Sequence, residues 1–368
     1  MKKLRIVNVI QCSNLGGMEQ ASLRLMQGLQ QRGHQLSLIS LHPLGPLAPQ
    51  LEASSVKCLG LGYGQVPLWR WLWSLRRELH RQNPDALLLT GHSLPILLAI
   101  FGFCRGRRLL AIHFHHTGVK SRWFWRLYYA LARRMVNAVT FPSDFVRYEA
   151  ESLCPALASK AYTVRNPIIP LAPITAAERL TARARFGLPT TGPILGNAGW
   201  LIPRKRFDIF LRTAAAILLQ QPDAHFLIAG DGPERQQLET LANDLGIAHA
   251  VVWLGWVDDM RTVYAALDIL LFHSDWDALP TTPLEAIALG IPVVSSLLNG
   301  GLFEVVRPGL DAVLLDQHDV PALAHAALQL LANPGAAASM ASQGRSHVLA
   351  LSEPEQLAAW HERAFTSL

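Results

Sequence analysis

The feature that most constrains the fold is an alternation of short apolar runs with longer amphipathic stretches, repeated in two successive series. In the first series, apolar runs that suit buried strands lie at 4–10, 35–40, 86–89, 109–114 and 138–141, with helical patterns at 18–31 and 68–80 between them. The second series places strands at 194–197, 225–229, 251–254, 269–272 and 292–295, and helices at 206–220, 234–245, 260–267 and 283–289. Such alternation predicts an α/β fold with two doubly wound, Rossmann-like parallel sheets, each covered by helices on both faces.

The join between the two series is a proline- and alanine-rich stretch at 168–177, which follows a further strand at 161–164. We interpret this stretch as a linker. In open parallel sheets, ligands bind outside the carboxyl ends of the strands, so we expect both units to face a common cleft.

Composition excludes several classes of protein. The four cysteines are far apart and form no C-x-x-C pair, which argues against a disulfide framework and a cysteine zinc site. The apolar run near the N-terminus is short and no small-residue cleavage site follows it, so no export signal is predicted. The longest apolar stretch, 86–103, is interrupted by Gly91 and Pro95 and favours a strand, a loop and a helix over a membrane span. We therefore expect a cytoplasmic protein.

Charge divides the chain into two halves. Residues 1–170 hold 21 Lys and Arg against 7 Asp and Glu, a net charge of +14, whereas the remainder holds 12 against 20, a net charge of −8. In the basic half, arginine clusters at 70–81, 105–108 and 122–134 are interleaved with tryptophans. Arginine and tryptophan at one surface suit the face of an anionic membrane. The alternative is that the tryptophans are core residues and the arginines only solubilise helices. No nucleic-acid-binding motif is present, so we expect no nucleic acid partner.

Glycine-containing turns follow two of the predicted strands. Gly16 and Gly17 follow the first strand, and Gly230 and Gly232 follow the strand at 225–229. Such turns let a ligand approach the backbone, and the helix that follows offers free N–H groups to an anion, although many turns of this kind bind nothing. Neither matches G-x-G-x-x-G, which disfavours a dinucleotide-dependent dehydrogenase.

Charged residues mark two further loops. Arg204, Lys205 and Arg206 stand together where a loop meets a helix, an arrangement that suits a diphosphate. Asp277 and Glu285 bracket seven residues that lead into another helix. The N–H groups at that helix start suit an anion, and the carboxylates suit sugar or ribose hydroxyls.

Six motifs occur in a specific order: GGME, GWLIPRKRFD, GDGPERQQL, GWVDDM, DALPTTPLEAIALGIPVV and NGGLFE. Together they resemble the retaining glycosyltransferases of the glycogen-synthase-like fourth family, and the resemblance covers nearly the whole chain. It implies the two-domain GT-B architecture, with an acceptor-binding domain at 1–170, a nucleotide-sugar-binding domain at 171–352 and a helix at 353–368 that packs back on the N-terminal domain. It also implies that no cofactor and no metal is required.

The resemblance implies roles for residues of the donor site. Glu285 would hold the ribose of the donor, and Asp277 would contact the transferred sugar near its anomeric carbon. Lys205 would neutralise the diphosphate with help from Arg204 or Arg206. The backbone around the helix start would meet sugar and phosphates, and the residues concerned are Thr281, Thr282, Pro283 and Leu284.

In the first half, Gly16 and Gly17 match the family loop that closes on the donor, and His115 or His116 would contact the donor sugar. The chain also departs from the family at two positions. Trp200 stands where the family commonly has arginine, and Asp277 replaces the first glutamate of the family pair with a side chain one methylene shorter.

The implied activity is metal-independent transfer of a sugar from a nucleotide-sugar donor, with retention at the anomeric carbon. The acceptor would be a glycolipid or oligosaccharide of cell-surface polysaccharide or lipopolysaccharide biosynthesis, met at the inner face of the membrane. Two alternatives stay open: a nucleotide-sugar 2-epimerase of the same fold, and a catalytically inactive subunit that only binds the nucleotide sugar.

Overall fold

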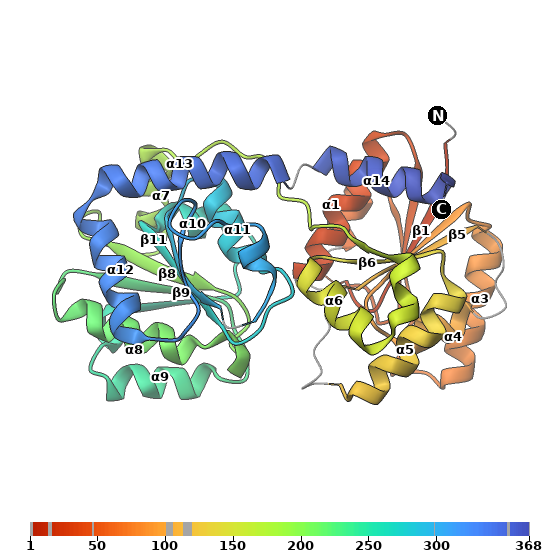
Figure 1. Cartoon of the computed structure of the whole chain (residues 1–368), viewed down its shortest axis with the longest axis horizontal. Coiled ribbons are helices and arrows are strands. Elements are labelled where there is room, and N and C mark those ends of the chain that lie inside the picture. The colour runs from red at the N-terminus through yellow and green to blue at the C-terminus, as the bar shows by residue number, and fades with distance from the viewer. Residues whose placement is uncertain are drawn as a thin grey trace. The chain divides into compact units, whose positions relative to one another are not determined.

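A computed structural model describes residues 3–13, 17–45, 48–100, 106–112, 120–297, 299–351 and 354–367. The chain divides into two compact units, one made of Met1–Pro167 with Ser352–Leu368 and the other of Ile168–Leu351. Each unit contains one parallel sheet with helices on both faces (Figure 1). The expected α/β class with two Rossmann-like domains is therefore confirmed.

The sheet of the first unit has the strand order β3-β2-β1-β4-β5-β6-β7, and every neighbouring pair is parallel. Its central strands are buried on both sides, as the continuous apolar runs of the sequence predict. The strands are β1 (Arg5–Ile10), β2 (Gln35–Ser40), β3 (Lys57–Gly60), β4 (Ala86–Thr90), β5 (Arg107–Ala111), β6 (Ala138–Phe141) and β7 (Ala161–Thr163).

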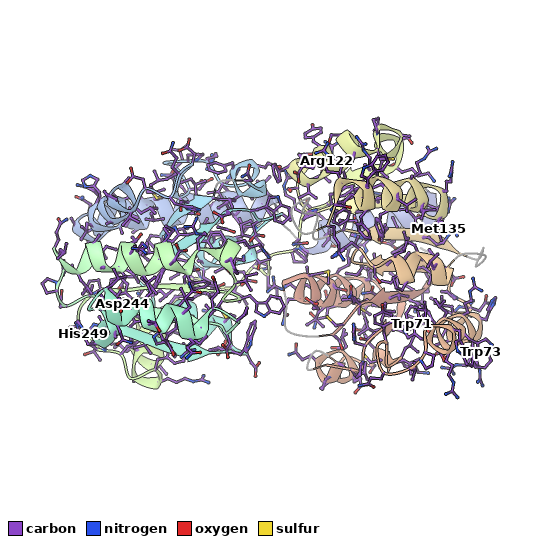
Figure 2. All side chains as sticks on the ribbon, turned by 90° about the horizontal axis from the view of Figure 1, so that it is seen from below. Trp71, Trp73, Arg122, Met135, Asp244 and His249 are labelled. Carbon is purple, nitrogen blue, oxygen red and sulfur yellow. The ribbon has the colours of Figure 1, made fainter. Side chains whose placement is uncertain are left out.

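Two groups of helices cover the opposite faces of this sheet (Figure 1). One group includes α1 (Gly17–Gln31) and α14 (Pro354–Ser367), and the other includes α3 (Leu68–Gln82), α4 (Leu94–Ile100) and α5 (Arg122–Met135). Figure 2 looks onto the second group and labels Trp71 and Trp73 on α3 and both ends of α5. The remaining helices of the unit are α2 (Ala48–Ala53), α6 (Asp144–Leu153) and the 3-10 turn Pro155–Lys160.

The C-terminal helix α14 belongs to the first unit although the chain reaches it from the second. Its Ala358 and Phe365 join Leu25 and Leu29 of α1 in one buried cluster. An ion pair of 2.6 Å between Arg32 and the buried Glu362 adds a polar contact to the same interface.

The second unit has the strand order β10-β9-β8-β11-β12-β13, again with parallel pairs throughout. The order reverses between β8 and β11, so the chain leaves these two adjacent strands towards opposite faces of the sheet. Such a switch point opens a crevice at the carboxyl ends of the strands. The strands are β8 (Ile194–Ala198), β9 (His225–Ala229), β10 (Val251–Gly255), β11 (Ile269–Ser274), β12 (Val293–Leu297) and β13 (Val313–Leu315).

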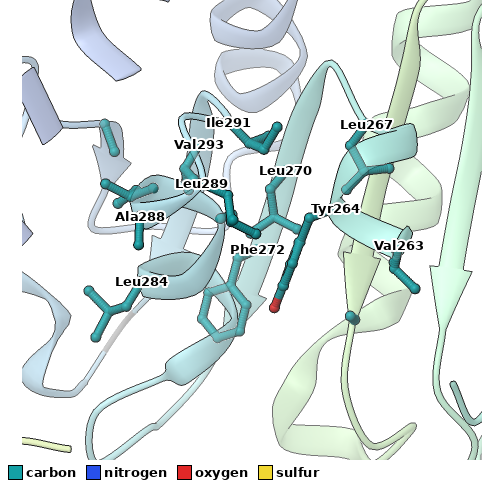
Figure 3. Packing of buried hydrophobic residues seen from close by; sticks show 14 of the residues in the cluster. Val263, Tyr264, Leu267, Leu270, Phe272, Leu284, Ala288, Leu289, Ile291 and Val293 are labelled. Atoms are coloured by element: carbon teal, nitrogen blue, oxygen red, sulfur yellow. The ribbon is translucent and has the colours of Figure 1, made fainter. Parts of the chain in front are cut away.

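Apolar side chains from both faces of this sheet form the core of the second unit. In the part shown in Figure 3, Tyr264 and Leu284 pack with Leu270 and Phe272 of β11. The helices of the unit are α7 (Ala176–Arg185), α8 (Phe207–Leu218), α9 (Arg235–Asp244), α10 (Met260–Ala266), α11 (Thr281–Ala288), α12 (Val320–Ala332) and α13 (Pro334–Leu351), with 3-10 turns at Pro203–Lys205, Ala248–Ala250 and Gly301–Glu304.

The predicted linker at 168–177 begins where the first unit ends, and it is fastened to the second unit. Ile168 is buried in the core of that unit. Arg345 donates a hydrogen bond to the carbonyl of Leu171 at 2.8 Å, and Arg261 donates one to that of Ala172 at 3.0 Å. The last residues of the stretch already belong to α7, which Thr175 caps. The prolines prevent a helix in this stretch, but the chain still packs against the surface of the second unit.

Candidate functional site

The candidate site lies at the switch point of the second sheet. Strands β8 and β11 pair directly, with Leu195 opposite Ile269 and Gly196 opposite Leu270. The loop after β8 carries Lys205, and the loop after β11 carries Asp277. Because parallel strands end at the same edge of a sheet, two loops far apart in the sequence meet here.

The meeting of these loops produces a largely buried ion pair. Lys205 Nζ lies 2.5 Å from Asp277 Oδ2, and the ammonium group also lies over the ring of Phe272 at 5.1 Å. Arg204 donates to the carbonyl of Trp276 at 3.0 Å and approaches the same Asp277 oxygen at 3.6 Å. The structure therefore brings together three residues that the sequence predicted for the donor site.

Arg206 is held inside the loop by two carboxylates of the protein. Its guanidinium donates to both oxygens of Asp208 at 2.9 Å and to Asp275 at 3.0 Å. The hydrogen bonds to Asp208 raise the pKa of Arg206. The residue also adopts the left-handed conformation, with φ of 45°, where it joins the 3-10 turn to α8. Arg206 thus braces the loop, and of the three predicted cations only Arg204 and Lys205 approach Asp277.

A chain of buried polar side chains continues from Asp275 into the sheet. His318 donates from Nε2 to Asp275 at 3.1 Å and accepts at Nδ1 from Ser296 Oγ at 2.7 Å, and Ser296 accepts from Nδ1 of His273 at 2.8 Å. The far nitrogen of His273, Nε2, is buried without a hydrogen-bond partner among the described residues. Burial lowers the pKa of His273 to about 3, so the ring is neutral at neutral pH.

The N-terminus of α11 begins beside the same loops. Thr282 donates from its hydroxyl to the carbonyl of Ala198, at the end of β8, over 3.2 Å. Among the described residues no side chain caps this helix, because its N-cap position is Pro280. The N–H groups of the first turn have no partner within the helix and carry partial positive charge. Thr281, Thr282, Pro283 and Leu284 therefore form the predicted helix start.

Glu285 lies in the second turn of α11 and has a partner that the sequence did not reveal. The hydroxyl of Tyr264, on α10, donates to Glu285 Oε2 at 2.9 Å. Tyr264 itself is buried in the core (Figure 3), so its hydroxyl is a fixed partner for the carboxylate. Tyr264 belongs to an ordinary amphipathic helix, and no motif distinguishes it from other core aromatics.

A glycine allows the Asp277 loop its close approach to the next loop. Asp277 accepts from the N–H of Gly301 at its carbonyl oxygen and donates its own N–H to the carbonyl of Asn299. A β-carbon on Gly300, where φ is 155°, would lie 2.1 Å from the carbonyl oxygen of Asp277. The motif NGGLFE thus supports the backbone that carries Asp277.

Two tryptophans line a hollow of about 510 Å³ at the ends of β8, β9 and β10. Trp200 and Trp256 are 59% and 52% exposed, and their rings meet edge to face with centroids 6.5 Å apart. Asp231 and Gly232 form another side of the hollow. Trp256 belongs to the motif GWVDDM, but unlike Trp200 it was not predicted as a site residue.

In the first unit, Gly17 is the first residue of α1. Gly16, His115 and His116 lie outside the described residues. Glu19 was not predicted as a site residue. It is buried in the first turn of α1, where desolvation raises its pKa, and it accepts from Cys12 Sγ at 3.1 Å.

Two features are absent from the described part of the chain. No cluster of three or more His, Cys, Asp or Glu among them is arranged to hold a metal ion. No helix in the described ranges is both long and apolar enough to cross a membrane.

Two family models match the chain. Residues 178–347 match the model of glycosyl transferases group 1, and residues 15–170 match that of glycosyltransferase family 4. Together the two matches cover most of the chain, and each model describes glycosyltransferases. Lys205, Asp277 and Glu285, which meet near the switch point, lie within the part of the chain that the group 1 model matches.

Two curated proteins that the chain resembles in part are also glycosyltransferases. The chain is 32% identical over 162 residues to the lipopolysaccharide core biosynthesis glycosyltransferase LpsE of Rhizobium meliloti, a match that covers 44% of this chain and 46% of that protein. It is 32% identical over 180 residues to a GDP-mannose-dependent phosphatidylinositol monomannoside mannosyltransferase of Mycolicibacterium smegmatis, covering 46% and 47%. The chain thus spans about half the length of the curated relatives it matches.

A solved structure extends the similarity of fold to both units. Anabaena HepE, crystallised with UDP and glucose, superposes with a TM-score of 0.87 at 17% identity, covering 99% of this chain and all of that one. At this identity the likeness shows the fold alone. It is the two-domain GT-B architecture that the motifs predicted.

Proposed function

We propose that the protein transfers a sugar from a nucleotide-sugar donor to a glycolipid or oligosaccharide acceptor in cell-surface polysaccharide or lipopolysaccharide biosynthesis. The observation that carries the proposal is the Lys205–Asp277 ion pair beside the start of α11, at the switch point of a glycosyltransferase domain. The names of LpsE and of the crystallised HepE complex support a sugar donor of this kind.

The donor's diphosphate would bind where positive charge converges. Glycosyl transfer needs a stabilised leaving group, and preorganised charges aimed at it are the strongest means of stabilisation. Lys205 and Arg204 supply full charges, and the free N–H groups of α11 supply partial ones. We propose that these groups suffice without a metal, and that no cofactor is required.

Asp277 and Glu285 would hold the two sugar rings of the donor. Tyr264 fixes the Glu285 carboxylate, which suits the two hydroxyls of a ribose. Asp277 contacts Arg204 and Lys205 through its Oδ2 atom. A diphosphate bound to Lys205 would therefore lie next to this carboxylate, and the transferred sugar attached to the diphosphate would meet it. We propose retention at the anomeric carbon, with the leaving phosphate accepting the proton of the acceptor hydroxyl.

The hollow beside Trp200 and Trp256 would hold the planar base of the nucleotide. Aromatic side chains stack on every nucleobase because each base presents a flat π-face. The hollow lies at the ends of β8, β9 and β10, at the same edge of the sheet as Lys205. In this arrangement Trp200, which stands where the family commonly has arginine, would stack on the base. Arg204 would supply the second positive charge beside Lys205.

The acceptor would be carried on a lipid at the cytoplasmic face of the membrane. The mannosyltransferase relative is named for a phosphatidylinositol acceptor, and the LpsE relative for lipopolysaccharide core. The described cysteines Cys12, Cys58 and Cys154 are thiols outside any disulfide.

A panel of labelled nucleotide sugars tests the proposal, first for binding by calorimetry and then for turnover. Lys205→Ala should reduce turnover of the bound donor by about 10²–10³-fold, the loss typical when one transition-state charge donor is removed. Arg212→Ala, an exposed cation on α8 of the same unit, serves as the matched control and should leave turnover unchanged.

Three results would contradict the proposal. Near-normal turnover of Lys205→Ala would remove the lysine from the diphosphate site. Release of free 2-epimerised sugar without an acceptor would show an epimerase. Tight binding of a nucleotide sugar with neither transfer nor slow hydrolysis would show an inactive subunit.

A further inference from the structure

Helices α3 and α5 expose large apolar side chains that a monomeric protein normally buries. Trp69 and Trp73 on α3 are 70% and 60% exposed, and Trp123 on α5 is 76% exposed. Leu68 and Leu127 are exposed on the same helices. Exposed apolar residues that gather in one region mark an interaction site.

The same two helices also bury aromatic side chains. The tryptophans of these clusters are therefore divided between core residues and exposed residues. Trp71 and Trp125 are fully buried, whereas Trp69, Trp73 and Trp123 are exposed. Trp69 and Trp73 are four residues apart, a spacing that places them on one face of α3. Each helix therefore has one face in the core and one outward face that is aromatic as well as charged.

Arginines accompany all three exposed tryptophans. Arg70 lies over Trp69 at 5.7 Å, Arg77 over Trp73 at 5.3 Å, and Arg126 over Trp123 at 5.5 Å. Each pair places a positive charge next to an amphipathic ring. Both kinds of group are favoured at the headgroup level of a lipid bilayer.

The net charge of this surface is strongly positive. The two helices contain eight arginines and one carboxylate, Glu78, which Arg81 already pairs at 2.6 Å. The arginines are outward-facing, with only Arg133 partly covered. Helix α4 packs against both α3 and α5 and adds the exposed Leu98, so the three helices form one continuous face.

We propose that this face, which we call the α3–α5 face, docks the protein on the surface of an anionic lipid bilayer. The face lies on the membrane and does not cross it. Anionic lipid complements the arginines, and a bilayer interface also accommodates the three tryptophans and three leucines. The proposal deepens the proposed function by naming the surface that meets a lipid-borne acceptor, but its physical test needs neither donor nor acceptor.

The test is binding of the full chain to vesicles of phosphatidylglycerol and phosphatidylcholine in equal parts, compared with pure phosphatidylcholine. We expect binding to the anionic vesicles at low salt and loss of most of it at 0.5 M NaCl, because salt at about this concentration screens charges beyond roughly 4 Å. Each arginine near an anionic surface contributes about fivefold to partitioning. The double variant Arg76→Glu/Arg126→Glu should therefore bind at least 25-fold more weakly, on the order of two such steps.

The aromatic part is tested by Trp73→Ala/Trp123→Ala, which removes exposed side chains and leaves the buried Trp71 and Trp125 in place. Its binding should also fall, and brominated lipids should quench the fluorescence of the wild type more than that of the variant. The matched control, Arg212→Glu/Leu219→Ala, changes an exposed cation and an exposed leucine of the second unit and should bind as the wild type does.

Equal binding of the α3–α5 variants and the wild type would overturn the proposal. It would also fall if single-stranded nucleic acid bound tightly and displaced the vesicles, since the face would then recognise a polyanion. A donor site that fails the Lys205 test leaves the vesicle result untouched, so the two proposals fail separately.

Discussion

His273 is the buried end of the polar chain that runs through Ser296 and His318 to Asp275, and acid should destabilise the protein through it. The ring donates from Nδ1, and its Nε2 faces the interior without a partner among the described residues. Protonation would place a positive charge on that nitrogen, which is why burial lowers the pKa of His273 from 6.5 to about 3. The unfolded chain has no such restriction and takes up the proton near its ordinary pKa.

The magnitude follows from this difference in pKa. Between the two pKa values the unfolded state binds more protons than the folded state, so stability falls as pH drops below 6.5 and stops falling below about 3. Lowering the pH from 7 to 5 should cost about 2 kcal/mol of unfolding free energy through this one residue. That is a large fraction of the stability of a typical domain.

The assay is urea denaturation at pH 7 and pH 5 for the wild type and for His273→Asn. Asparagine keeps a donor for Ser296 but cannot be protonated, so the variant should start less stable at pH 7 and lose about 2 kcal/mol less between the two pH values. His249→Asn, at an exposed histidine of the same unit, is the matched control and should keep the wild-type dependence. The reasoning is refuted if His273→Asn shows the same loss of stability on acidification as the wild type.

Three further substitutions test how the site is held. Gly300→Ala should destabilise the protein by about 1–3 kcal/mol and weaken donor binding, because the new β-carbon would lie 2.1 Å from the Asp277 carbonyl oxygen. The control is Gly309→Ala, at a positive-φ glycine with nothing within 4 Å, which introduces backbone strain without the clash. Denaturation and calorimetry of both variants separate the two effects. Tyr264→Phe removes the hydroxyl that holds Glu285 and should weaken binding of a nucleoside diphosphate about tenfold, a typical value for a hydrogen bond to a charged group; unchanged affinity would exclude the proposed ribose contact. Trp256→Ala should weaken the same binding at least about fivefold through lost stacking, with Trp256→Phe restoring most of it in the same titration.

Local pattern predicted much of the fold, because strands and helices depend on residues that are near in sequence. The expected strand at 35–40 is β2, and the one at 225–229 is β9. Less periodic segments were missed, such as α2 and β3, where six- and four-residue elements offer little pattern to read. The boundary between the units falls at the start of the predicted linker, but its attachment to the second unit could not be read from proline content, which reports on helix formation.

Local sequence is enough to show which chemical groups are available: a lysine after one strand, two carboxylates around a helix start, and tryptophans beside arginines. Which of these groups meet depends on how distant segments pack. Lys205 reaches Asp277 because β8 and β11 are neighbours, and strand order depends on the crossovers of the whole sheet rather than on any local pattern. The same holds for the contact of Tyr264 with Glu285, and for Trp71, which packs inside while Trp73, two residues later, remains outside. A side chain's partner depends on packing between distant segments, and that information is not contained in the residues next to it.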